Sequence, residues 1–276
     1  MSSRNSADVQ ALTVLVVGAT GSVGRLVVAE ALARGHRVRA LVRNVTRAAF
    51  LPAKAQRVVG DPTDEATLAG AVSGIDAVVF THGSSTGRRV DAERVDYGAV
   101  RNVLRALDGR AVRVALMTAI GVTNLLGEYN RRTGAHDWKR RSERLLRASG
   151  LAYTIVRPGW FDYNAPDQLA LRLLQGDRRQ AGDPSDGVVA RRQIAEVLVA
   201  SLSSEAARGK TFELIAERGP APQRLESLFD GLDVDLPAAL DGVYDSTNMP
   251  LHCEPENVRD DLRQLAPAGL LLTERR

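Results

Sequence analysis

The sequence is predicted to fold as an α/β protein in which helices cover both faces of a parallel β-sheet. Short continuous runs of Val, Leu and Ile alternate with amphipathic stretches of helical length, and such runs are typical of strands that are buried on both faces. A glycine follows each of the first helical stretches, at the position where glycine commonly ends a helix; these residues are Gly35, Gly74, Gly109 and Gly150.

The strands that we expect, in chain order, occupy residues 13–17, 37–42, 57–59, 77–80, 112–117 and 153–156. Helices are expected between them at residues 23–33, 65–72, 92–107 and 137–148. This alternation predicts a doubly wound parallel sheet of the Rossmann type. Beyond Pro158 the pattern loosens, and we expect a short helix at 168–174, a helix at 192–202 and a strand at 210–214.

We expect three parts along the chain. Residues 1–11 are mostly polar and predict a disordered N-terminal tail, and residues 12–218 are expected to form the main domain. Residues 219–276 combine many Pro, Gly and Asp residues with short helical patches, which predicts a small C-terminal lobe packed on that domain. The length of 276 residues suits one large α/β domain with such a lobe.

The composition argues against several classes of protein. Hydrophobic residues make up 44% of the chain and charged residues 25%, and no apolar run approaches the roughly 20 residues of a membrane helix. The single cysteine, Cys253, excludes an internal disulfide, and we expect no metal site. We also expect a soluble, cytoplasmic protein without a signal peptide. The net charge is +4, but the basic residues are spread along the chain and interleaved with acidic ones. We therefore expect neither nucleic acid nor a membrane as partner.

A glycine-rich turn directly follows the first strand. The run from Gly18 to Gly24 has the spacing G-x-x-G-x-x-G and lies between an apolar strand and an amphipathic helix. Glycine is needed there for a tight turn, for close approach of a diphosphate to the main chain and for close helix–sheet packing, and the helix N-terminus favours negative charge. The sequence therefore predicts a dinucleotide site formed by Gly18, Thr20, Gly21, Ser22, Val23 and Gly24.

The end of the second strand indicates which dinucleotide binds. NAD sites usually place an acid about 20 residues past the fingerprint, but here Arg43 stands nineteen residues after Gly24, and no Asp or Glu occurs between Arg37 and Arg47. A guanidinium can pair with the 2′-phosphate of NADP, which is worth roughly 1.5–3 kcal/mol, or on the order of 10- to 100-fold in affinity. We therefore predict NADP(H) as the cofactor; the alternative is that Arg43 simply ends a strand.

Two further strand ends add candidate cofactor contacts. Asp61 and Pro62 follow the third strand, where Asp61 can accept a hydrogen bond from the adenine amino group or can cap the next helix. Three candidates follow the fourth strand, namely Thr81, His82 and Gly83. Gly83 would let the main chain run beside the cofactor, whereas His82 is either a contact or an exposed loop residue.

These motifs resemble those of atypical short-chain dehydrogenases/reductases of the NAD(P)H-binding, NmrA-like kind. The resemblance covers residues 12–215 and also rests on the runs at 118–122, 138–143 and 150–159. Catalytic members carry a Tyr and a Lys four residues apart on one helix, and a Ser or Thr at the end of the fifth strand. The resemblance implies that Lys139 binds the nicotinamide ribose and that Thr118 supplies the hydroxyl that polarises the substrate.

The chain departs from this family pattern at the Tyr. Ala135 stands four residues before Lys139 and has no proton to give, and Ala119 aligns with the Ser or Thr position as well as Thr118 does. The candidate substitutes for the Tyr are His136, Asp137 and Tyr129. Their alternative roles are structural: an exposed His at a helix start, and a Tyr that packs within its own loop.

The loop after the sixth strand gathers aromatic side chains. Pro158 and Gly159 are expected to approach the nicotinamide, because ligands bind beyond the carboxyl ends of such strands. Trp160 is expected to contact the cofactor. With Phe161 and Tyr163 it forms either an apolar pocket wall or an anchor for the C-terminal lobe.

Together these features predict an NADP(H)-binding oxidoreductase that acts on a small carbonyl or enone compound, as a monomer or a homodimer. The missing Tyr leaves open a second hypothesis, a non-catalytic NADP(H) redox sensor that regulates a protein partner. A nucleotide-sugar epimerase or dehydratase is a third hypothesis, although that chemistry also uses a Tyr as acid and base.

Overall fold

A computed structural model describes residues 11–269, and an eight-stranded sheet of order β3-β2-β1-β4-β5-β6-β10-β8 lies at its centre. Its strands are β1 Thr13–Val17, β2 Arg37–Val42, β3 Gln56–Val59, β4 Ala77–Phe80, β5 Arg113–Met117, β6 Ala152–Pro158, β8 Ala170–Leu174 and β10 Lys210–Glu217. Neighbouring strands pair in parallel, except that β8 runs antiparallel to β10. The direction of winding reverses between β1 and β4, so the predicted doubly wound, Rossmann-type fold is confirmed.

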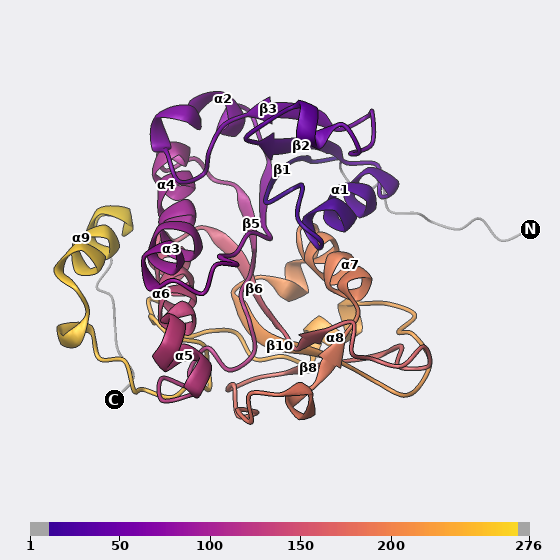
Figure 1. The fold of residues 1–276 in the computed structure, drawn as a ribbon, viewed down its shortest axis with the longest axis vertical. Coiled ribbons are helices and arrows are strands. Elements are labelled where there is room, and N and C mark those ends of the chain that lie inside the picture. The colour runs from indigo at the N-terminus through magenta and orange to yellow at the C-terminus, as the bar shows by residue number, and fades with distance from the viewer. Residues whose placement is uncertain (1–10, 270–276) are drawn as a thin grey trace, which may run out of the picture.

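Helices cover both faces of this sheet (Figure 1). One face carries α1 Gly24–Ala33 and α7 Arg191–Ser201, and the other carries α2 Ala69–Val72, α4 Gly98–Leu107, α6 Ala135–Ala148 and α9 Glu256–Leu265. Shorter elements are α3 Arg89–Asp91, α5 Glu128–Thr133, α8 Glu226–Asp230 and the paired strands β7 Trp160–Phe161 and β9 Val188–Val189. None of the helices in the described residues is long and apolar enough to cross a membrane.

The first strand shows why these runs are apolar throughout. Val14 and Val16 of β1 pack with the α1 and α7 layer, whereas Leu15 and Val17 pack with the α4 and α6 layer. All four side chains are fully buried. Because successive side chains of a strand point to opposite faces, a strand covered on both sides buries all of them, and β1 is apolar at each of these four positions.

The expected helix at 168–174 is wrong. Its residues form the edge strand β8, in which Leu171 is buried and Arg172 is exposed. The main chain of this segment pairs with β10 from Glu213 to Glu217. Five residues of helical propensity cannot outweigh the hydrogen bonds that an open sheet edge offers, because short isolated helices are marginal in water.

The expected helix at 92–107 is present but interrupted. Residues Ala92–Tyr97 form a π-helical turn, and regular α-helix begins only at Gly98. A π turn inserts an extra residue into the helix, and such turns are often found at functional sites. Here the turn contains Asp96, which is almost fully buried.

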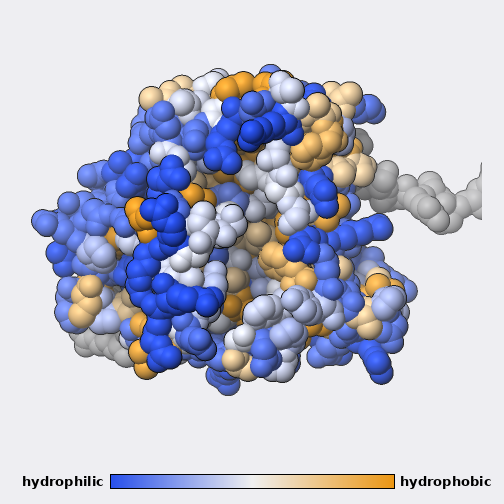
Figure 2. Space-filling view, viewed as in Figure 1, coloured by the Kyte–Doolittle hydropathy of each residue, from blue (hydrophilic) through white to orange (hydrophobic). Residues whose placement is uncertain are grey.

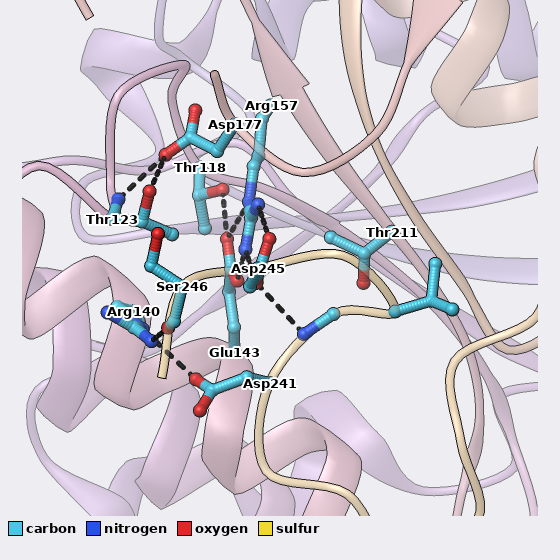
Figure 3. A network of polar contacts seen from close by, with 12 residues as sticks. Thr118, Thr123, Arg140, Glu143, Arg157, Asp177, Thr211, Asp241, Asp245 and Ser246 are labelled. Carbon is cyan, nitrogen blue, oxygen red and sulfur yellow. Dashed lines mark hydrogen bonds and ion pairs between the residues drawn. The ribbon is translucent and has the colours of Figure 1, made fainter. Parts of the chain in front are cut away.

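A ladder of buried arginines fastens the C-terminal segment to α6. Arg144 donates to both carboxylate oxygens of Asp241, at 3.0 and 2.7 Å, and to Glu254 at 2.9 Å. Arg140 also binds Asp241, and Figure 3 shows it beside that carboxylate. Only a planar guanidinium can form such a fork, which gives a physical reason for Arg rather than Lys at these positions.

Two of the expected parts extend beyond the described residues. The tail at 1–11 lies outside them except for Ala11, and so do residues 270–276 of the expected lobe. Within the described part, the segment after residue 218 contains α8 and α9. Helix α9 packs along α4 and α6, whereas α8 lies near β8, and its Phe229 packs with Phe212 in the core on the opposite face of the sheet.

Candidate functional site

The glycine turn after β1 has a geometry that excludes side chains. Gly18 adopts a φ of +87°, and the Gly21 amide donates to the Gly18 carbonyl at 2.9 Å. A Cβ added to Gly24 would lie 2.0 Å from that same carbonyl oxygen. The Thr81 hydroxyl fixes the turn from the neighbouring strand end, since it lies 3.1 Å from the Val17 carbonyl oxygen.

The helix that follows this turn begins without a cap. No side chain bonds to the first amides of α1, and its first turn contains no acidic residue. Thr20, Gly21 and Ser22 are exposed at the same end, whereas Val23 is buried beneath them. The Arg25 and Leu26 amides already donate to carbonyls of the turn. The positive end of the helix dipole, which has neither a side-chain cap nor an acid beside it, still favours an anion, so the turn fits the diphosphate of a dinucleotide.

Arg43 lies just beyond the carboxyl end of β2, the strand that pairs with β1. Its side chain is exposed, and no ion pair or hydrogen bond of this guanidinium occurs within residues 11–269. A phosphate near the fingerprint turn would therefore meet an uncommitted cation at this strand end.

Asp61 is partly engaged within its own turn. Its Oδ1 atom accepts from the amide and the hydroxyl of Thr63, at 2.9 and 2.8 Å. The adjacent Pro62 carbonyl accepts from Asn102 at 3.0 Å. These bonds stabilise the loop after β3, and both readings of Asp61, as an adenine contact or as a loop acid, stay predictions.

The buried Asp96 pairs with Lys139. The Lys139 Nζ atom lies 2.5 Å from Asp96 Oδ1, which also accepts from the Ser84 amide at 3.1 Å. A Cβ on Gly83 would lie 3.4 Å from the same Nζ atom. The loop after β4, the π turn and α6 therefore meet at Lys139, and Asp96 is a site residue that the sequence analysis missed.

Unpartnered polar atoms surround this ion pair. Four buried side-chain atoms here have no hydrogen-bond partner, namely His82 Nδ1, Ser84 Oγ, Asp96 Oδ2 and His136 Nδ1. Burial lowers the pKa of His82 to about 4, with Asp96 opposing the shift and Lys139 adding to it. Burial and the charge of Lys139 also lower the pKa of His136, so both rings are neutral near pH 7. Buried polar atoms are rarely left unpaired, so this cluster points to a polar ligand.

Thr118 lies in a different polar network. Its hydroxyl donates to Glu143 Oε1 at 2.7 Å, and Arg157 binds the same carboxylate through two bonds (Figure 3). Polarising a carbonyl oxygen requires a donor, and the only proton of this hydroxyl is already engaged. A catalytic role of Thr118 therefore requires that its bond to Glu143 be exchanged.

The candidate substitutes for the missing Tyr lie at the start of α6. The Tyr129 ring packs against the His136 ring with 5.2 Å between centroids, and about half of the tyrosine is exposed. Asp137 accepts from the Asn130 amide group at 2.6 Å, which fastens α5 to α6. Ala135 is buried and offers no polar atom.

The loop after β6 packs tightly against the segment before α7. A Cβ on Gly159 would lie 2.4 Å from the Gly187 carbonyl oxygen, and the Trp160 amide donates to that same oxygen at 2.9 Å. The Trp160 and Tyr163 rings meet edge to face, with 6.1 Å between centroids. Arg191, the first residue of α7, donates to Ser22 of the fingerprint at 3.0 Å, a contact that sequence reasoning did not predict.

A recess opens near the middle of the molecular face, and α1 and α6 stand on its two sides (Figures 1 and 2). A separate cavity of about 570 Å³ lies at the opposite, amino-terminal edge of the sheet, where Thr13, His36 and Lys54 are among its lining residues. Because ligands of doubly wound sheets bind at the carboxyl ends of the strands, the recess is the better candidate.

Several known proteins are similar to this chain in sequence. Quinone oxidoreductase 2 of Escherichia coli is 29% identical over 212 residues, which span 74% of this chain and 68% of that protein. An uncharacterized sugar epimerase of Bacillus subtilis is 28% identical over 238 residues, which span 79% and 100%. An uncharacterized chloroplast protein of Arabidopsis thaliana is 30% identical over 235 residues, which span 77% and 72%.

Solved structures show the same fold. A protein of Bacillus halodurans, assigned as an NAD-dependent epimerase/dehydratase, superposes with a TM-score of 0.67 at 25% identity, over 80% of this chain and 100% of that one. The family model described as NAD(P)H-binding matches residues 18–205, from the first fingerprint glycine to beyond α7. With its fingerprint turn, its uncapped α1 and its Lys139 cluster, the chain belongs to the NAD(P)H-binding family of Rossmann-fold proteins.

Proposed function

We propose that this protein is an NADP(H)-dependent oxidoreductase that reduces a small carbonyl or enone compound, with quinones as the favoured substrate class. The observation that carries the proposal is the Lys139–Asp96 ion pair, which lies among four unpartnered buried polar atoms. A ligand with several hydrogen-bonding groups would satisfy these atoms, and the nicotinamide ribose and carboxamide are such groups.

The preference for NADP(H) rests on Arg43. Its guanidinium is exposed and uncommitted within the described residues, and no acid stands between Arg37 and Arg47 to receive the ribose hydroxyls of NAD(H). A charge-assisted bond to the 2′-phosphate would favour NADPH over NADH by on the order of 10- to 100-fold.

The chain would hold the cofactor along the carboxyl ends of the strands. The fingerprint turn and the N-terminus of α1 would bind the diphosphate, and Lys139 would bind the nicotinamide ribose. When bound, the reduced nicotinamide supplies a hydride to an electrophilic carbon of the substrate. Asp96 would orient the Lys139 ammonium from its buried side, because it already accepts from that group.

Hydride transfer leaves an anion on the substrate, and this anion must take up a proton. Because the Tyr that would donate this proton is missing, the basicity of the anion indicates which substrate class the chain can reduce. Reduction of an isolated ketone builds a basic alkoxide, which needs an acid beside it. Reduction of a quinone builds an aromatic hydroquinone anion, a weaker base that takes its proton from water. Overall, NADPH, a quinone and one proton give NADP⁺ and a hydroquinone. With Ala135 in the Tyr position, a quinone fits this chain better than a simple ketone, and the similarity to a quinone oxidoreductase supports the same class.

The test is the substitution Lys139→Ala. We expect a weaker affinity for NADPH and a slower reduction of a soluble naphthoquinone, because one residue serves both. Lys54→Ala, which removes an exposed lysine far from the strand carboxyl ends, is the matched control. If K139A matches the control in both measurements, the role assigned to Lys139 is wrong.

The second candidate is a redox sensor of the NmrA-like kind, which binds NADP(H) without turnover. The absence of a donor at Ala135, together with the committed hydroxyl of Thr118, favours it. A sensor should bind NADPH and NADP⁺ with clearly different affinities and reduce no compound of a broad carbonyl and quinone panel. An epimerase or dehydratase is a weaker candidate, although two of the similar proteins carry such names.

We also propose the organisation in which residues 12–218 bind the nucleotide and the lobe at 219–276 packs on them. The buried ion pairs of α6 with Asp241 and Glu254 support it. We propose the cytoplasm as the compartment, although several of the similar proteins are chloroplast proteins.

A further inference from the structure

Arg191 reaches from the start of α7 to the fingerprint turn. Its Nε atom donates to the Ser22 hydroxyl oxygen at 3.0 Å, although the two residues are 169 positions apart. About a third of the side chain is exposed. The guanidinium therefore lies at the N-terminus of α1, which no side chain caps.

Asp162 and Phe161 hold this guanidinium in place. Asp162 accepts from the Arg191 amide at 2.9 Å through Oδ1 and pairs with Nη1 through Oδ2. The Phe161 ring lies beneath the guanidinium, with 5.1 Å between its centroid and Cζ. Asp162 itself adopts a left-handed φ of +58°, a conformation that Asp tolerates better than most residues. The side chain is thus oriented before any ligand arrives.

The local electrostatics call for an anion. An Arg at a helix N-terminus opposes the helix dipole, and Arg191 and Arg192 both occupy the first turn of α7. The neighbouring N-terminus of α1 adds a second positive dipole end without an acid in its first turn. Asp162 is the carboxylate paired with Arg191 in the described residues, and it is half exposed. Positive potential at this point is therefore only partly neutralised.

We infer that Arg191 binds the diphosphate of the dinucleotide and exchanges its Ser22 contact for a phosphate oxygen when the cofactor binds. The inference rests on the proposed cofactor binding and adds a residue from outside the fingerprint to it. A guanidinium suits this task because it can donate to two oxygens of one phosphate while Asp162 keeps it oriented.

The diphosphate is common to NADPH and NADH, whereas the 2′-phosphate is not. Arg191→Gln should therefore weaken both cofactors by a similar factor, about 10- to 100-fold for a lost charge-assisted bond. Arg191→Lys should recover part of the loss, because it keeps the charge but not the fork. Arg192→Gln is the matched control, since its exposed side chain pairs only with Glu196 on the same helix in the described residues.

The experiment is calorimetric titration of the four proteins with NADPH and NADH, together with the unfolding midpoint of each protein without ligand. An equal loss for both cofactors in R191Q, with a midpoint close to that of R192Q, supports the inference. Wild-type affinity in R191Q overturns it, and so does a loss of affinity that a comparable fall in midpoint accompanies. If the wild-type protein binds neither cofactor, the proposed function itself fails, and this inference fails with it.

Discussion

Glu213 on β10 makes the stability of the protein depend on pH in an unusual direction. Its side chain is 3% exposed, and its Oε1 atom has no hydrogen-bond partner. Burial raises the pKa of this carboxyl from 4.5 to about 8, with Arg157 opposing the shift and Asp177 adding to it. Arg157 lies 3.7 Å away, but Glu143 and Asp245 already engage its guanidinium, so burial dominates.

The sign follows from the two pKa values. Between pH 4.5 and about 8 the folded protein keeps a proton on Glu213 that the unfolded chain has lost, so the free energy of unfolding falls as pH rises through this window. The whole shift in the pKa of Glu213 corresponds to about 5 kcal/mol of unfolding free energy. His82 acts in the opposite sense, since its pKa is lowered from 6.5 to about 4 and its contribution is lost as pH falls through that range. Above pH 6.5, His82 therefore no longer offsets the fall in unfolding free energy that Glu213 causes.

The perturbation is Glu213→Gln, which keeps the shape of the protonated side chain and removes its titration. Between pH 6.5 and 8 we expect the wild-type protein to lose about 2 kcal/mol of unfolding free energy, and we expect E213Q to lose far less. Urea unfolding at several pH values in this range measures both slopes. Glu217→Gln is the matched control, because Glu217 lies on the same strand but is half exposed. Parallel slopes for E213Q and the wild-type protein would refute the reasoning.

Three further predictions concern the site and its support. Gly24→Ala places a methyl group 2.0 Å from a main-chain oxygen of its own turn, so we expect a loss of about 1–3 kcal/mol in stability and much weaker binding of NADPH. Gly70→Ala is the control: its methyl group meets open space, so it should lower neither the stability nor the affinity. Asp96→Asn removes the anionic partner of Lys139, so we expect a loss of about 1–3 kcal/mol of unfolding free energy, measured with urea. We also expect weaker binding of NADPH by calorimetry. An unchanged affinity would contradict the role of Asp96 in orienting Lys139. Arg144→Met removes one guanidinium partner from Asp241 and from Glu254, which keep Arg140 and Arg141 as partners, so we expect a loss of about 1–3 kcal/mol and faster proteolysis of the segment after residue 230. Equal resistance to protease would exclude a clamping role.

Much of the sheet could be predicted from the sequence because strands such as β1 and β4 are apolar on both faces. Runs such as that of β1 have no other stable location than between two helical layers. The edge strand β8 could not be predicted in the same way, because its pairing with β10 depends on a partner some forty residues away. The π turn could not be predicted either, because no residue type in Ala92–Tyr97 indicates that the helix contains an extra residue there.

The fingerprint could be predicted for a similar reason: its function depends on glycine, and glycine is visible in the sequence. Asp96 and Arg191 could not be found, because each matters only through a residue distant in the chain, Lys139 and Ser22. One signal was present for Arg191, namely a basic residue at a helix start, where an acid or a cap is the usual choice. The arginine ladder of α6 could not be predicted either, because its carboxylate partners, Asp241 and Glu254, lie in the C-terminal segment and approach α6 only in the folded protein.

The central claim is that this fold holds NADP(H) and selects it through Arg43. A calorimetric titration of the wild-type protein and of Arg43→Ala with NADPH and NADH in parallel tests it most directly. We predict that the wild-type protein binds NADPH more tightly than NADH by on the order of 10- to 100-fold, and that R43A loses this preference while keeping its affinity for NADH. Equal binding of the two cofactors by the wild-type protein would contradict the selection, and binding of neither would contradict the claim as a whole.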